Sequence, residues 1–178
     1  MNTTTSKGVR YLVQAGVIAA IYAALTLLAS SLNLAYGPVQ FRISEFLTVL
    51  PMFTPAAIPG LTIGCFLANL ASPFGAADWI FGTLATLSAA VLSYLCRKIA
   101  VKGVAILVPL WPVVSNALII GVELACFSDA GFGFAHFHWA AFGYNALTVG
   151  AGELIICYAL GLPFAVFLQK TNLAKKIF

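Results

Sequence analysis

Long apolar stretches with almost no charge inside them constrain this chain more than any other feature. The first, residues 11–32, is about 20 residues long, which suffices to cross a bilayer and exceeds the apolar core of a signal peptide, so we expect an uncleaved helix. Across the chain, 62% of residues are hydrophobic and only 8% are charged, whereas a soluble domain carries about 25% charged residues. The sequence therefore excludes a soluble domain and predicts an all-α integral membrane protein.

The apolar runs and the residues that interrupt them predict a bundle of six transmembrane helices in one domain, residues 1–178. We expect these helices at roughly 10–32, 46–57, 58–72, 78–96, 103–126 and 142–168. The second and third are short, and Pro51, Pro55 and Pro59 recur there at every fourth residue. Because proline bends or breaks a helix, we expect the freed backbone groups to be shielded by protein or to line a cavity.

The basic residues mark one side of the membrane. Eight of the nine precede the first helix, join the fourth to the fifth, or follow the sixth: Lys7, Arg10, Arg97, Lys98, Lys102, Lys170, Lys175 and Lys176. The positive-inside rule makes this side cytoplasmic, so both termini are expected in the cytoplasm. Because these residues form short clusters between apolar runs, the net charge of +4 does not indicate nucleic-acid binding.

The acidic residues segregate the opposite way, to the outer half of the bilayer or beyond it: Glu45, Asp78, Glu123, Asp129 and Glu153. Glu153 lies about eleven residues into the last helix, roughly 16 Å along it and so near mid-membrane. Arg42, the ninth basic residue, accompanies them. The aromatic, glycine-broken stretch 127–139 is expected to be a loop that caps the outer face.

Two predicted helices each present an amide and a carboxylate on one face. Asn116 and Glu123 are seven residues apart, and Asn145, next to Tyr144, lies about two turns before Glu153. Ionisable groups inside a membrane cost a few kcal/mol and need partners, a polar cavity or protonation. The pattern therefore predicts an outward-opening polar pocket that binds a ligand. The alternative is a structural network of hydrogen bonds between helices.

Two further segments supply candidate ligand residues. Arg42 and Glu45 close the first loop, and Asp78-Trp79 opens the fourth helix. An interfacial ion pair of Arg42 with Glu45 or Asp78 would explain the charges, and helix capping with an interfacial indole would explain Asp78 and Trp79. A flat aromatic ligand would use the same residues, with the indole stacking and a carboxylate accepting N–H donors.

Motifs for catalysis and for metal binding are missing from the sequence. It contains no Gly-x-x-x-x-Gly-Lys-Ser/Thr phosphate loop, no Gly-x-Ser-x-Gly and no His-Glu-x-x-His. His136 and His138 have no clear third and fourth ligand nearby, and the four cysteines are far apart. We therefore expect no enzymatic activity, no metal ion and no cofactor.

Four stretches resemble the QueT family. They are YGPVQFRISEFLTVLP at residues 36–51, FTPAAIPG at 53–60, GCFLAN at 64–69 and DWIFGTLAT at 78–86. The resemblance extends over nearly the whole chain. It implies the substrate-binding S component of an energy-coupling factor (ECF) transporter in the plasma membrane of a bacterium. Six helices and an external site for a queuosine precursor of the 7-deazaguanine type would follow.

The resemblance also implies protein partners: a transmembrane coupling protein and two cytoplasmic ATPases, which accounts for the missing phosphate loop. Small residues recur at every fourth position of the first helix, and small-xxx-small spacing lets helices approach closely. S components use such an alanine-rich first helix to contact the coupling protein, so the candidate partner-binding residues are Ala15, Ala19 and Ala23, with Gly16, Ala20 and Ala24 beside them.

A 7-deazaguanine fits the residue types at hand. A carboxylate can accept its N1–H and exocyclic amine together, Asn or Arg can donate to its carbonyl, and Trp79 or Tyr144 can stack on its rings. A second carboxylate would balance an aminomethyl group. Three alternatives stay open: an S component for another vitamin or nucleobase, a membrane enzyme that uses Glu123 or Glu153 as acid or base, and a purely structural subunit.

Overall fold

The computed structural model describes residues 3–36, 39–99 and 105–178, so Lys102 lies outside the described residues. Helices dominate this part of the chain, and the α-helices are α1 (Thr3–Ser31), α2 (Ala57–Asn69), α3 (Ala76–Leu95), α4 (Leu110–Ala125), α5 (Trp139–Ile156), α6 (Leu162–Lys170) and α7 (Leu173–Ile177). Short 3₁₀ helices are η1 (Ile43–Met52), η2 (Cys96–Lys98) and η3 (Phe134–His136). The prediction of an all-α membrane protein is confirmed.

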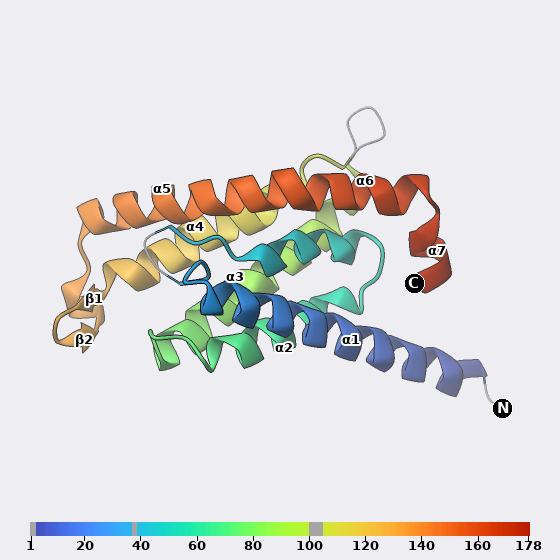
Figure 1. Cartoon of the computed structure of the whole chain (residues 1–178), viewed down its shortest axis with the longest axis horizontal. Helices are drawn as coiled ribbons and strands as arrows, with labels where there is room; N and C mark the ends of the chain where they lie inside the picture. Colours follow the sequence, from blue (N-terminus) through green and yellow to red (C-terminus); the bar gives the residue numbers. More distant parts are fainter. Residues whose placement is uncertain (1–2, 37–38, 100–104) are drawn as a thin grey trace.

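Three helical segments are long and apolar enough to cross a membrane: Lys7–Ser31, Ala76–Lys98 and Trp139–Lys170. Three shorter apolar helices, η1, α2 and α4, lie where the second, third and fifth spans were expected. That these three also cross the bilayer stays a prediction. Both ends of the chain lie at the same end of the bundle (Figure 1), where the Arg10 Nη2 donates a hydrogen bond to the carbonyl of Ile177, 3.2 Å away.

Helix α1 packs closely on α2 through small residues. A β-carbon added at Gly60 would lie 2.8 Å from the carbonyl oxygen of Ala15, and one at Gly64 would lie 2.7 Å from that of Ala19. Both glycines are therefore needed for this approach, as small-xxx-small packing requires. Ala15 and Ala19 are buried as a result.

The proline-rich segment forms η1 and then a short link to α2. Within η1, Pro51 cannot donate a backbone hydrogen bond, which fits a 3₁₀ segment in place of a full α-helix. Leu47, Val49 and Leu50 are nevertheless buried, so η1 contributes to the core of the bundle. Its first turn carries Glu45, which the surrounding helices enclose completely.

The last span is interrupted by a π-helical turn, η4 (Cys157–Gly161), between α5 and α6. Gly161 packs against η1, since a β-carbon there would lie 3.4 Å from the carbonyl oxygen of Phe46. The Cys157 thiol lies 3.6 Å from Oε2 of Glu153 and 3.8 Å from the carbonyl oxygen of Glu45. The turn therefore sits beside two of the buried carboxylates, and π-turns are frequent at functional sites.

A small hairpin of β1 (Phe127–Ser128) and β2 (Gly131–Phe132) lies at the end of the bundle opposite the termini (Figure 1). Aromatic side chains of the hairpin pack against α3: the ring centroids of Phe132 and Phe81 are 5.6 Å apart. Phe74, just before α3, lies 5.2 Å from Phe127 by the same measure. The hairpin thus covers the end of the bundle at which α3 begins.

Candidate functional site

Polar side chains from several elements of the bundle lie in its interior. We call this set the buried polar cluster; its members are each at most 3% exposed, and they are Arg42, Glu45, Asn69, Asp78, Asn116, Glu123 and Glu153. They come from the end of the first loop, η1, α2, α3, α4 and α5. Electrostatic interactions connect Arg42 with Glu45, Asp78, Glu123 and Glu153. The cluster is therefore treated as one candidate site.

Arg42 is held by amide and thiol groups of α2. Its Nη2 donates to Oδ1 of Asn69 at 2.8 Å and to the Sγ of Cys65 at 3.4 Å. Asn69 in turn donates through Nδ2 to the backbone carbonyl of Asp78 at 2.9 Å, which ties α2 to α3. These hydrogen bonds replace the direct ion pair with Glu45 or Asp78 that would have explained Arg42 structurally.

Glu45 is anchored by hydroxyl groups on one side only. Its Oε1 accepts a hydrogen bond from the Tyr22 hydroxyl of α1 and another from Thr86 Oγ1 of α3, the latter at 3.5 Å. Its Oε2 is buried without a partner among the described residues. Asn116 lies close to Glu45, but neither atom of its amide has a hydrogen bond of acceptable geometry. Glu45 is therefore fixed in place with one oxygen left free.

Unpartnered polar atoms concentrate in this cluster. Within the described part of the chain, the following atoms of the cluster are buried and have no hydrogen-bond partner: Arg42 Nε, Glu45 Oε2, Asp78 Oδ2, Asn116 Nδ2 and Oδ1, Glu123 Oε1 and Oε2, and Glu153 Oε1. Each such group costs about 1–3 kcal/mol, and more if it is charged. Buried polar groups in proteins are usually hydrogen-bonded, so this concentration of unpartnered atoms sets the cluster apart from the rest of the interior.

The charge of the cluster is unbalanced. Four carboxyl groups face a single guanidinium, that of Arg42. Carboxylates only accept hydrogen bonds when ionised, so the cluster offers many more acceptors than donors. It therefore suits a ligand that is rich in N–H groups or that carries a positive charge.

Glycines make room for this arrangement. A β-carbon at Gly82 would collide with the amide of Asn69 and with Oδ1 of Asp78. One at Gly152 would collide with the backbone carbonyl of Gln40. Gly82 thus lets Asn69 cross from α2 to α3, and Gly152 lets the segment before Arg42 lie against α5.

The remaining predicted site residues lie at the edge of the cluster or outside it. Trp79 is half-buried, and its buried Nε1 has no hydrogen-bond partner among the described residues. Asn145 is also half-buried, whereas Tyr144 is 61% exposed. Tyr144 points away because the neighbouring Ala146 is the residue that packs against Gly121 of α4. The structure therefore separates Tyr144 from the cluster.

Sequence reasoning missed several residues that hold the cluster together: Tyr22, Cys65, Asn69, Thr86 and Cys157. All five are fully buried. They carry no charge at neutral pH, so the charge pattern gives no sign of them. A usable signal was the four-residue spacing of Asp78, Gly82 and Thr86, which places them on one helical face.

The predicted partner-binding residues are mostly covered within the chain. Ala15 and Ala19 face α2, and only Ala23 of the three is partly exposed. The neighbouring ridge of Gly16, Ala20 and Ala24 is exposed instead.

Comparison with known proteins assigns the chain to a family. Residues 12–170 match the QueT transporter family. The queuosine precursor transporter QueT of Lactococcus lactis subsp. cremoris (strain MG1363) is 40% identical over 76 residues, which are 43% of this chain and 44% of that protein. The aligned stretch thus spans less than half the length of that relative, and no solved structure matches. Since the family match covers most of the chain, the protein belongs to the QueT transporter family.

Proposed function

We propose that this chain is the substrate-binding S component of an ECF-type importer and that it takes up a queuosine precursor of the 7-deazaguanine type. Family membership and the name of the Lactococcus relative support the transport role and the substrate class. The observation that carries the proposal is the buried polar cluster with its unpartnered carboxylate and amide atoms. These atoms match the donor-rich edge of a 7-deazaguanine.

Glu123 is the residue best suited to that edge. Both of its carboxylate oxygens are buried and unpartnered, so they can accept the ring N1–H and the exocyclic amine side by side, in a bidentate arrangement. The carbonyl oxygen beside N1 then needs a donor. Asn116 supplies one through Nδ2 and Arg42 another through Nε, both of which are unpartnered.

Glu153 and Asp78 have one free oxygen each. In this proposal, one of them accepts from the pyrrole N–H or from an aminomethyl ammonium group on the ring. Trp79, half-buried at the start of α3, covers the ring face.

The energising partners are proposed to be a transmembrane coupling protein and two ATPases, because the sequence has no phosphate loop. The exposed ridge of Gly16, Ala20 and Ala24 on α1 is the surface proposed to meet the coupling protein. The proposed location is the plasma membrane of a bacterium with both termini in the cytoplasm, which the basic residues near the termini support.

Calorimetry on the purified chain tests the substrate class. We expect a 7-deazaguanine to bind and 7-deazahypoxanthine, which lacks the exocyclic amine, to bind roughly tenfold or more weakly, because one acceptor of Glu123 would be left unpaired. Riboflavin and thiamine serve as controls for other S-component ligands. Equal binding of the two 7-deazapurines, or tighter binding of riboflavin or thiamine, would refute the proposed substrate. Recovery of a chemically altered ligand would instead indicate an enzyme.

A further inference from the structure

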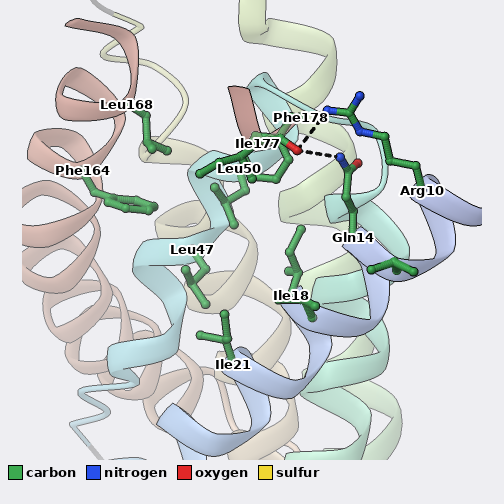
Figure 2. A pocket seen from close by; sticks show the side chains of 12 residues that line it. Arg10, Gln14, Ile18, Ile21, Leu47, Leu50, Phe164, Leu168, Ile177 and Phe178 are labelled. Carbon is green, nitrogen blue, oxygen red and sulfur yellow. Dashed lines mark hydrogen bonds between the residues drawn. The ribbon is translucent and has the colours of Figure 1, made fainter. Parts of the chain in front are cut away.

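A second concave region, lined by none of the residues of the buried polar cluster, lies between α1, η1 and α6. It has a volume of about 510 Å³, and Figure 2 shows Ile18, Ile21, Leu47 and Phe164 around it. Of the described residues that line it, only Arg10 and Gln14 carry polar side chains. We call it the apolar groove. Its composition excludes it as a second site for a hydrogen-bonding base.

The C-terminal segment closes one end of the groove. Nη2 of Arg10 and Nε2 of Gln14 both donate to the carbonyl oxygen of Ile177, at 3.2 and 3.0 Å (Figure 2). Phe178 also lines the groove at this end. The polar end of the groove is thus at the termini, and the apolar remainder runs along α1 toward the middle of the bundle.

The groove is open on the side of α1. Val13, Val17 and Ile21 line it and are 58%, 52% and 46% exposed. On a chain that spans a membrane, such exposed apolar side chains face lipid hydrocarbon or another protein.

The basic residues around the polar end of the groove favour a lipid over another protein as the molecule that fills it. Besides Arg10, the exposed basic residues near the two termini in the sequence are Lys7, Lys170, Lys175 and Lys176. The described acidic residues lie elsewhere: four are in the buried polar cluster, and Asp129 is in the turn of the hairpin at the opposite end. A basic rim beside an apolar groove complements an anionic headgroup joined to an acyl chain, and basic pockets between membrane helices bind such lipids.

We propose that the apolar groove binds one anionic phospholipid. Its acyl chain lies against Val17, Ile21 and Leu47, and its phosphate is bound by Arg10 with the lysines of α7 nearby. The guanidinium has further N–H donors besides the Nη2 that reaches Ile177, so Arg10 can hold the C-terminal segment and the phosphate together. This inference rests on the membrane location of the chain and not on the identity of its transported substrate.

Native mass spectrometry of the full chain tests the proposal, with phosphatidylglycerol and phosphatidylcholine of identical acyl chains as probes. We expect one phosphatidylglycerol retained per chain and phosphatidylcholine retained at least about fivefold less, since each basic group near an anionic lipid contributes about 1 kcal/mol. Arg10→Gln should reduce this preference about fivefold, and Val17→Trp, which fills the groove, should lower the retention of both lipids.

Matched controls are Lys98→Gln, which removes an exposed basic residue of η2, and Leu84→Trp, which enlarges an exposed apolar residue of α3. Both should retain lipid as the unaltered chain does. Equal retention of the two lipids by the unaltered chain would overturn the proposal. So would undiminished phosphatidylglycerol retention in both Arg10→Gln and Val17→Trp. Because Arg10 is exposed, its variant gives a result even if Val17→Trp does not fold.

Discussion

The buried polar cluster and the apolar groove differ in almost every property, although η1 contributes residues to both. The cluster is enclosed on all sides, and polar atoms without partners gather in it. The groove is open, apolar, and polar only where Arg10 and Gln14 meet the C-terminal segment. The two regions differ because one is enclosed and the other is open. A buried polar atom without a hydrogen bond costs free energy, whereas an exposed apolar surface in a membrane can contact lipid at no such cost. The proposed ligand of the cluster is therefore defined by its hydrogen-bonding groups, and that of the groove only by its chemical class.

Removing the one positive charge of the cluster should have the largest effect. In Arg42→Met, Asn69 loses its donor and the four carboxyl groups lose their counter-charge, so the free energy of unfolding should fall by about 3–5 kcal/mol. Denaturant unfolding in detergent measures it. Lys98→Met, an exposed control, should change stability by less than about 0.5 kcal/mol. An Arg42 variant as stable as the control would mean that the carboxyl groups do not need the guanidinium.

Replacing the free carboxylate of Glu123 should weaken ligand binding more than folding. Glu123→Gln keeps the shape but turns one acceptor into a donor, so affinity should fall by about 1.5–3 kcal/mol, roughly ten- to more than a hundredfold. Calorimetry measures the affinity, and thermal unfolding without ligand should change little. Asp129→Asn, on the hairpin, is the control. Lowered stability with unchanged affinity would make Glu123 a structural residue.

The two faces of α1 should respond differently to the same enlargement. Ala19→Leu places extra atoms against Gly64 of α2 and should destabilise the chain by about 1–3 kcal/mol. Ala20→Leu, on the exposed ridge, should leave stability unchanged but weaken co-purification with the coupling protein. If Ala20→Leu co-purifies normally, the partner surface lies elsewhere on the chain.

The two aromatic residues among the predicted site residues should give the smallest effects. Trp79→Ala should weaken ligand binding about two- to tenfold, as expected for the loss of one stacking contact of about 0.5–1.5 kcal/mol. Tyr144→Ala should change affinity less than twofold, because Tyr144 is 61% exposed. A larger effect of Tyr144 than of Trp79 would contradict the assignment of the ligand to the buried polar cluster.

Composition alone predicts the all-α membrane fold, and the charge pattern predicts most of the residues that meet in the cluster. A charged side chain within a membrane is energetically costly and therefore rare, which draws attention to Arg42, Glu45, Asp78, Glu123 and Glu153. Their role in ligand binding stays a prediction.

What the sequence could not supply is the packing that joins these residues. Tyr22 and Asn69 are uncharged, so nothing in the charge pattern distinguishes them from residues that merely fill space. Ala15 and Gly16 look equally suited to a partner in sequence, and only the position of α2 decides which one is covered.

The π-turn η4 constrains the number of residues that the last span can have. One residue more than an α-helical turn rotates everything beyond it by about 100°. From Glu153 to Lys170 the buried residues are 153, 156, 157, 161, 165 and 168, so the buried face of α5 continues through η4 into α6. Deleting a single residue here would leave hydropathy and length almost unchanged, yet it would turn Ala165 and Leu168 away from the core. Membrane proteins usually tolerate changes that preserve hydrophobicity. In this segment, however, the loss of one residue would rotate every later residue of the span, so the number of residues is constrained as well as their hydrophobicity.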